Sequence, residues 1–200
     1  MGSSIIYRSV VLYRLAMNVL YRGRYRARFA NVCELMRETD RTVLELCFGD
    51  VAVAGYCRSH GVSWIGLDLS EAFVSYAVRQ RFDARRANVM RPGTLPACDV
   101  CIMMGSLYHF RTQLPDLFRR IKAAAPRLIL SEPVRNWTHA SGVLRFLART
   151  LTRADTQEET FRFDETSLLR TLGELKAEVG FDYRVVSVAR DMVVEVVWSS

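Results

Sequence analysis

The sequence lacks the long apolar run that a membrane-spanning helix needs, which is about 18–20 uninterrupted residues. Arg8 and Arg14 interrupt the one candidate, near the start of the chain. The same break, with no small-residue cleavage site after it, argues against a secretory signal peptide. The sequence also has no Pro/Gly/Ser-rich linker, internal repeat or low-complexity segment. These absences predict a single globular domain over residues 1–200, located in the cytoplasm.

Lysine is nearly absent, with only Lys122 and Lys176, so arginine carries the net charge of +7. Residues 1–41 hold eight arginines against three acidic residues. This excess could attract an anionic small molecule, a membrane surface or nucleic acid, or it could be a solvated helix face. Nucleic acid is not the favoured partner, because no nucleic-acid-binding motif accompanies the charge. A membrane surface contacted through a helix over residues 4–20 remains open.

The cysteines form neither a disulfide framework nor a zinc site. Their number is odd, at five, and the one C-x-x-C runs from Cys98 to Cys101. No second C-x-x-C and no pair of histidines stands at ligand spacing. We therefore expect reduced thiols that pack as small hydrophobic residues, and no metal ion.

Hydrophobic periodicity divides the chain into a helical start and an α/β remainder. Residues 4–37 carry apolar side chains at three- and four-residue steps, with a break at Gly23. Short apolar runs then alternate with segments long enough for helices, and the predicted strands are residues 42–46, 64–67, 100–104 and 127–130. Fully apolar strands of this kind predict a parallel sheet covered on both faces, which is a three-layer α/β sandwich.

Capping and breaking residues mark helices in the second part of the chain. We expect helices after Ser70, over residues 114–124, and from Asp164 to Gly180. In the first of these, Phe73, Ala77 and Val78 should face the core. The last two apolar runs, residues 183–188 and 192–198, predict an antiparallel hairpin.

A turn with a single glycine follows the first predicted strand. Residues 43–51, VLELCFGDV, have the pattern of a strand, a turn around Gly49 and the start of a helix. Such a turn places backbone N–H groups and a helix N-terminus at the carboxyl end of a sheet, where nucleotide-like ligands bind. The dinucleotide fingerprint with three glycines is absent, which disfavours a nicotinamide-dependent oxidoreductase.

Polar residues follow the next predicted strands. Asp68, in IGLDLS, could accept hydrogen bonds from both hydroxyls of a ribose, or simply interact with the dipole of the next helix. Asn88 and Val89, in ANV, could contact the edge of an adenine ring. Tyr108 and His109 follow the buried strand in DVCIMMGSLYHF.

These segments, with RLILSEPV at residues 127–134, resemble in order and spacing the successive motifs of class I S-adenosylmethionine-dependent methyltransferases. The resemblance extends from about residue 40 to the end of the chain. It implies a seven-stranded, mostly parallel Rossmann-like sheet with a C-terminal antiparallel hairpin, preceded by N-terminal helices. The single domain would consist of a helical cap, a cofactor-binding core, a lid-like insertion, and a final helix and hairpin, at residues 1–40, 41–135, 136–163 and 164–200.

The resemblance assigns the cofactor, S-adenosylmethionine, to residues at the ends of these strands. Glu45 would anchor the amino group of the methionine end, with Cys47 and Gly49 in the turn beneath it. Asp68 would hold the ribose hydroxyls, and Leu69 would pack against the adenine.

The same resemblance completes the predicted site with residues of two later segments. Asn88 would face the adenine amino group, and Val89 would offer its backbone N–H to the ring. Met103, Met104 and Gly105 would form the floor under the reactive sulfonium. No metal ion is implied.

Two of the three loop glycines of that family are replaced here, by Cys47 and Val51. A side chain narrows the space for the methionine carboxylate, and a non-glycine residue adopts a positive φ only at a cost in free energy. Cys47 is small, and Val51 could lie in the following helix at negative φ, so we interpret the turn as a working cofactor site. The alternative is a methyltransferase-like domain that has lost catalysis and serves as a binding or scaffold partner.

Three residues are candidates for chemistry on the acceptor. Methyl transfer from a sulfonium needs mainly alignment and exclusion of water, but a hydroxyl acceptor would also benefit from a base, such as a histidine with a pKa near ~6.5. His109 and its neighbour Tyr108 are the best placed, or else only shape the pocket. His139 is the second candidate, or a loop residue. The acceptor would be a small molecule, a saccharide or a lipid-linked precursor, and the N-terminal arginines would suit an anionic one.

Overall fold

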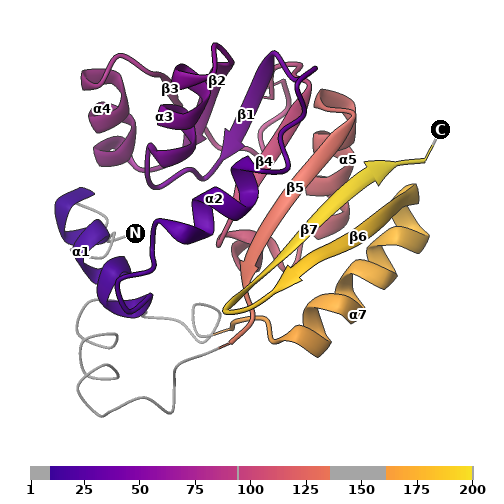
Figure 1. Ribbon diagram of the computed structural model, residues 1–200. Helices are drawn as coiled ribbons and strands as arrows, with labels where there is room; N and C mark the ends of the chain where they lie inside the picture. The colour runs from indigo at the N-terminus through magenta and orange to yellow at the C-terminus, as the bar shows by residue number, and fades with distance from the viewer. Residues whose placement is uncertain (1–9, 94, 136–160, 200) are drawn as a thin grey trace.

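The computed structural model describes residues 10–93, 95–135 and 161–199 (Figure 1). One seven-stranded sheet runs through the molecule in the order β3-β2-β1-β4-β5-β7-β6. The first five of these strands are parallel, and β7 pairs antiparallel with both β5 and β6. The strands are β1 (Thr42–Leu46), β2 (Ser63–Asp68), β3 (Asp83–Arg86), β4 (Val100–Met104), β5 (Arg127–Pro133), β6 (Phe181–Val188) and β7 (Asp191–Trp198). The predicted fold class is confirmed.

Side-chain alternation along the strands creates two cores, one on each face of the sheet. Leu44 and Met103 face α5 (Leu114–Ala124) and α7 (Glu165–Leu175), whereas Val43 and Ile102 face the opposite layer. That opposite layer contains α2 (Ala27–Cys33), α3 (Ala52–Ser59) and α4 (Glu71–Arg79), and Figure 1 shows these helices on the other side of the sheet from α7. Both faces are therefore covered, as the apolar strands require.

The strand predictions are confirmed where the apolar run is continuous. The bounds of β1 and β4 are those expected, and β2 and β5 extend beyond their apolar runs. The third strand has no apolar run, because β3 is the edge strand and reads Asp-Ala-Arg-Arg. The hairpin begins earlier than predicted, at Phe181, and its second strand begins at Asp191.

The helical start consists of α1 (Val10–Leu20) and α2, which end well before residue 37. Gly23 lies in the turn between them at φ +78°, a left-handed conformation that glycine adopts without strain, so the predicted break is confirmed. Tyr25, Phe29 and Val32 are buried against the sheet layer. Among the described helices, none is long and apolar enough to cross a membrane.

The later helices follow their capping signals, with one error of orientation. Phe73 and Ala77 of α4 are buried as predicted, but Val78 is 52% exposed. One residue rotates a helix by about 100°, which carries position 78 away from the face that position 77 shares with 73. The helix after Asp164 is confirmed, with a reciprocal capping box between Asp164 and Ser167.

The cysteines are free thiols as expected, and the described residues hold no group of three or more metal-ligating side chains. Most of the predicted lid-like insertion at residues 136–163, with the candidate His139, falls in the segment 136–160, outside the described ranges. The division into cap, core and insertion stays a prediction.

Candidate active site

The turn after β1 keeps a glycine-like backbone where glycine has been replaced. Cys47 has φ +54°, the same value as Gly49, and its N–H donates to the carbonyl of Leu67 at 2.7 Å. Holding a non-glycine residue in this left-handed region costs about 1–2 kcal/mol. Val51 has φ −99° at the start of α3, so this replacement carries no such penalty. Burial raises the pKa of the Cys47 thiol to about 12, which excludes a thiolate nucleophile at neutral pH.

Glu45, near the end of β1, is completely buried and held by a single hydrogen bond. The indole Nε1 of Trp64 donates to its Oε2 at 2.8 Å. The other oxygen, Oε1, is buried without a hydrogen-bond partner among the described residues. Burial raises the pKa of Glu45 well above its ordinary value. This carboxyl group can still accept a hydrogen bond from a donor such as an ammonium group.

Asp68 closes the neighbouring strand and contacts the turn. Its carboxylate accepts hydrogen bonds from the N–H of Ser70 at 2.7 Å and of Gly49 at 3.3 Å. Burial raises the pKa of Asp68, and these backbone donors partly oppose that shift. The carboxyl ends of parallel strands meet at one edge of a sheet, so Asp68 and Glu45 lie on the same edge.

The residues predicted to contact the adenine, and those predicted to lie below the sulfonium, differ in their exposure to solvent. Leu69 is 63% exposed at the end of β2, whereas Val89 is buried in the core. The amide oxygen of Asn88 accepts the N–H of Met90 at 2.9 Å, which forms a turn. Met103 and Met104 lie in β4 on opposite faces of the sheet, and both are buried.

Gly105 follows β4 at φ +64° and donates its N–H to the carbonyl of Ser131 at 2.7 Å. It is partly exposed, unlike Met103, which is fully buried. A Cβ added at Gly105 would lie 2.9 Å from Nη2 of Arg28. Gly105 therefore marks the point where the sheet edge meets the N-terminal helices.

Arg28 and Glu132 are two buried charged residues at this edge that the sequence analysis did not select. Glu132 is in β5, accepts the N–H of Leu107 at 3.1 Å, and has its Oε1 buried without a hydrogen-bond partner in the described ranges. Burial raises the pKa of Glu132 to about 8, against the opposing effect of Arg28. An acidic residue inside the apolar run RLILSEPV was the available signal for Glu132. Arg28 had no such signal, because it is one of eight arginines in residues 1–41 and nothing in the sequence distinguishes it from the others.

Tyr108 and His109 form a short 3-10 turn, η2 (Leu107–Phe110), directly after Gly105. Their rings lie 3.9 Å apart, and the guanidinium of Arg162 lies 3.7 Å above the Tyr108 ring. Desolvation by the surrounding chain, with the positive charge of Arg162, lowers the pKa of His109 to about 4, although the residue is exposed at the surface. The surrounding protein therefore disfavours the charged ring, which makes His109 a weaker base than a free histidine.

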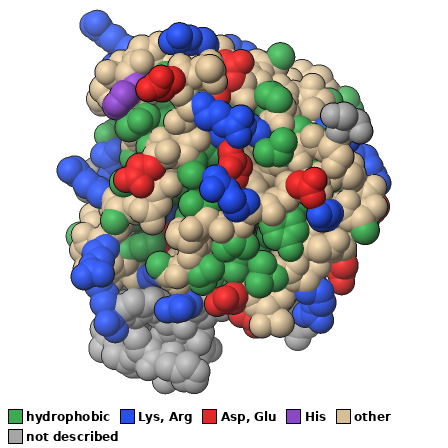
Figure 2. Space-filling model, turned by 45° about the vertical axis from the view of Figure 1, so that its right-hand side comes forward, with side chains coloured by type: hydrophobic (Ala, Val, Ile, Leu, Met, Phe, Trp, Pro, Cys, Tyr) green, Lys and Arg blue, Asp and Glu red, His purple; other side chains and the backbone are tan. Residues whose placement is uncertain are grey.

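The N-terminal helix α1 is tied to the turn by an ion pair. Arg14 donates to both carboxylate oxygens of Asp50, at 2.7 and 2.9 Å, and to the hydroxyl of Tyr76 at 2.9 Å. The arginines of the chain do not gather into one basic stripe on the face shown in Figure 2, where acidic side chains are interspersed among them. On this face the charge pattern does not favour a nucleic-acid partner.

No protein-family profile and no curated protein sequence matches the chain. Solved structures do match it. Human N-acetylserotonin methyltransferase, in complex with S-adenosylmethionine, superposes with a TM-score of 0.67 at 17% identity over 98% of this chain. Magnesium protoporphyrin IX methyltransferase from Synechocystis, with bound S-adenosylhomocysteine, gives a TM-score of 0.62 at 18% identity over 94% of this chain. The chain has the class I methyltransferase fold.

The match differs in extent between these methyltransferases. The chain spans 87% of the Synechocystis protein but only 58% of the human one. An O-methyltransferase family protein from Burkholderia thailandensis gives a TM-score of 0.67 at 17% identity, with 95% of this chain and 60% of that protein covered. At these identities the likeness concerns the fold.

Proposed function

We propose that this protein is an S-adenosylmethionine-dependent methyltransferase that acts on a small molecule, a saccharide or a lipid-linked precursor. The observation that carries the proposal is a set of buried polar atoms without hydrogen-bond partners in the described ranges, at one edge of the sheet. They are Nη2 of Arg28, Oε1 of Glu45 and Oε1 of Glu132. Buried polar atoms are normally paired, so a group of unpaired ones is consistent with a place where a bound molecule supplies the missing partners.

The donors and acceptors of this edge fit the cofactor. S-adenosylmethionine presents an ammonium group, a carboxylate and two ribose hydroxyls, and when bound it supplies a methyl group on a good, neutral leaving group. Oε1 of Glu45 would accept from the ammonium group, and Asp68 would accept from the hydroxyls. Cys47 and Gly49 would line the methionine end, with Met103, Met104 and Gly105 below the sulfonium.

The adenine would lie against Leu69, near Asn88 and Val89. The exposed side chain of Leu69 supports a role in covering a flat apolar ring. A protein that binds the cofactor in this way contributes to catalysis by aligning the acceptor with the methyl carbon and by excluding water.

His109 and Tyr108 are the proposed acceptor-side residues, with His139 as a further candidate. With a pKa of about 4, the His109 ring is neutral at physiological pH and can accept a hydrogen bond from an acceptor hydroxyl. It is a weak base, so it would favour an acidic acceptor over an alcohol. Arg162, beside Tyr108, adds positive charge that suits an anionic acceptor.

The second candidate function is a methyltransferase-like domain that binds a partner without catalysis. The observation in its favour is the contact between the cap and the turn. A Cβ added at Gly49 would lie 3.2 Å from Oη of Tyr13, so α1 covers the loop that would approach the methionine carboxylate. If this closure is permanent, the cofactor has no access.

Calorimetric titration with S-adenosylhomocysteine separates the two functions. A methyltransferase should bind it, and Asp68→Ala should weaken binding at least about tenfold, since it removes a charged hydrogen-bonding group. Asp83→Ala is the control, because Asp83 is half-exposed and pairs with Arg85 in β3, an outermost strand of the sheet. Absence of binding by the folded protein would favour the inactive domain, and binding of a nicotinamide dinucleotide instead would favour an oxidoreductase.

Contact with a membrane surface would extend the proposed function towards lipid-linked acceptors. Leu15 and Val19 lie one turn apart on α1 and are 61% and 50% exposed, close in sequence to exposed Arg22 and Arg24. The double variant Leu15→Glu/Val19→Glu should lose co-sedimentation with vesicles of anionic phospholipid. Val78→Glu is the matched control on α4, and an equal loss in that variant would exclude α1 as the contact.

A further inference from the structure

We infer that Arg28 binds the carboxylate at the methionine end of the cofactor, which makes an N-terminal cap residue part of the cofactor site. This inference rests on the proposed function. It identifies which side chain compensates for the two glycines that the turn after β1 has lost.

Arg28 is buried with its guanidinium turned towards the sheet edge. The residue is 7% exposed, and a Cβ on Gly105 would lie 2.9 Å from its Nη2. Burial raises the pKa of both Glu45 and Glu132, and the positive charge of Arg28 opposes that rise at both carboxyl groups. Arg28 therefore lies at the carboxyl edge of the sheet, where β1, β4 and β5 end.

The partners of Arg28 do not satisfy its donors. Nε lies 3.0 Å from Oδ2 of Asp191, an ion pair without hydrogen-bond geometry, and Nη2 has no hydrogen-bond partner among the described residues. The carboxylate of Asp191 also accepts from the hydroxyl of Tyr21, whose single O–H is shared between Oδ1 at 2.8 Å and Oδ2 at 3.0 Å. A buried guanidinium with unsatisfied N–H groups is stabilised by an anion that accepts them.

Aromatic rings hold the guanidinium in place. Its carbon lies 5.1 Å from the ring centre of Tyr21, 5.9 Å from that of Tyr25 and 5.7 Å from that of Phe29. Cation–π contacts of this kind fix the side chain before a ligand arrives. A preorganised donor loses little conformational entropy on binding.

The amino-acid end of the cofactor is a zwitterion, and the site offers one group for each of its charges. Oε1 of Glu45 is an unpaired acceptor suited to the ammonium group, and Nη2 of Arg28 is an unpaired donor suited to the carboxylate. Cys47 and Val51 limit how closely the turn can approach that carboxylate. Arg28 belongs to α2 and lies next to Gly105, so it is not one of the replaced turn positions.

The test compares S-adenosylhomocysteine with 5′-methylthioadenosine, which has the same adenosine part but no amino-acid carboxylate. Arg28→Met should weaken binding of S-adenosylhomocysteine by about 10- to 100-fold, and that of 5′-methylthioadenosine by less than about threefold. Arg28→Lys should give an intermediate loss for the first ligand, because a single ammonium group replaces the planar donor pair. Arg24→Met, an exposed arginine of the same cap, should leave both affinities unchanged.

An equal loss for the two ligands, or no loss for either, would overturn the role of Arg28. If the wild-type protein binds neither ligand, the proposed function fails and the inference fails with it. Near-ultraviolet circular dichroism reports whether each variant is folded. If Arg28→Met does not fold, Arg28→Lys provides the test. A greater loss of affinity for S-adenosylhomocysteine than for 5′-methylthioadenosine supports the role of Arg28, and an equal loss, or none, overturns it.

Discussion

Gly66 provides the space for the hydrogen bond that orients Glu45. Glu45 in β1 and Gly66 in β2 are paired across the two strands. The ring of Trp64, which donates the hydrogen bond to Glu45, lies against Gly66. A Cβ at this position would be 2.1 Å from Cη2 of Trp64 and 2.8 Å from Cδ1 of Phe48. The position of the Glu45 carboxylate therefore depends on the absence of a side chain at residue 66.

Gly66→Ala should reduce the free energy of unfolding by about 2–3 kcal/mol or more, because Trp64 and Phe48 have to move. Urea unfolding followed by fluorescence measures this change, and the binding of S-adenosylhomocysteine should weaken as Glu45 loses its donor. Gly55→Ala in α3 is the control, since no other atom lies within 4 Å of the added Cβ. Alanine should stabilise that helix by up to about 1 kcal/mol. Equal stability of the two variants would refute this role of Gly66.

Cys47 is the residue at which the turn stores backbone strain, at φ +54°. Cys47→Val should lower the free energy of unfolding by about 1–3 kcal/mol, because a β-branched side chain is poorly tolerated in the left-handed region. Cys47→Gly should stay within about 1 kcal/mol of the wild type, since relief of strain offsets the greater freedom of the unfolded chain. Chemical denaturation of both variants provides the measurement, and a Val variant as stable as the Gly variant would contradict the prediction.

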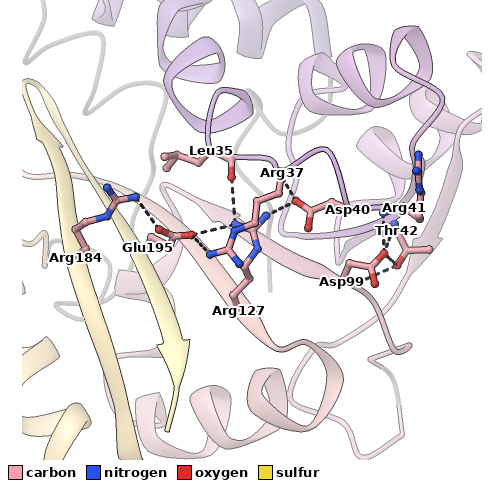
Figure 3. Close-up of polar contacts among 9 residues, drawn as sticks. All are labelled: Leu35, Arg37, Asp40, Arg41, Thr42, Asp99, Arg127, Arg184 and Glu195. Carbon is pink, nitrogen blue, oxygen red and sulfur yellow. Dashed lines mark hydrogen bonds and ion pairs between the residues drawn. The ribbon is translucent and has the colours of Figure 1, made fainter.

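At the scale of elements, a buried arginine connects the segment between α2 and β1 to the sheet. Arg127, at the start of β5, is 3% exposed and bonds the carboxylates of Asp40 and Glu195 (Figure 3). Arg37 and Arg184 reach Glu195 from the surface, at 3.0 and 2.9 Å. The network joins the segment between α2 and β1 to β5 and β7, at the amino end of the parallel strands and opposite the candidate active site.

Arg127→Met should lower the free energy of unfolding by about 3–5 kcal/mol, because it leaves the buried carboxylate of Asp40 without its positively charged partner and with only the backbone N–H of Arg37 as a donor among the described residues. Arg37→Met removes a half-exposed partner of Glu195 and should cost less than about 1 kcal/mol. Adding Asp40→Asn to Arg127→Met should restore part of the loss. Thermal and urea unfolding of the three variants would rank their losses in free energy of unfolding. Similar losses for Arg127→Met and Arg37→Met would show that the burial of Arg127 does not determine the size of the loss.

At the scale of the whole molecule, one edge of the sheet concentrates carboxyl groups whose pKa values are raised by burial. Glu45, Asp68 and Glu132 share this property. A carboxyl group with a raised pKa binds its proton more tightly in the folded protein than in the unfolded chain. Its contribution to stability is therefore complete below the unfolded pKa and declines as the pH rises to the folded pKa.

For Glu132 the decline should run from about pH 4.5 to about pH 8. Over that range Glu132 makes the free energy of unfolding fall by up to about 1.4 kcal/mol for each pH unit. Glu132→Gln should remove this contribution to the slope. Urea unfolding at several pH values measures the slope. Glu178→Gln, at a half-exposed position, should keep the wild-type slope. An unchanged slope in Glu132→Gln would show that Glu132 titrates normally.

Local pattern determined much of the fold in this protein. The continuous apolar runs predicted β1 and β4 to the residue, and capping chemistry predicted the start of α7. These features depend on residues close together in the chain, where alternation and capping leave a direct signal. The charged edge strand β3 left no such signal, because an edge strand does not need an apolar run.

The sequence also indicated Asp68, which stands at the end of a strand, and the resemblance to class I methyltransferases indicated Glu45. Only the tertiary structure decided which other groups join them. Arg28 meets Gly105 and Asp191 through contacts between distant parts of the chain, and burial changes the pKa values of His109 and Glu132. Burial and long-range pairing are properties of the folded packing, so no local sequence pattern could place Arg28 beside Gly105 and Asp191.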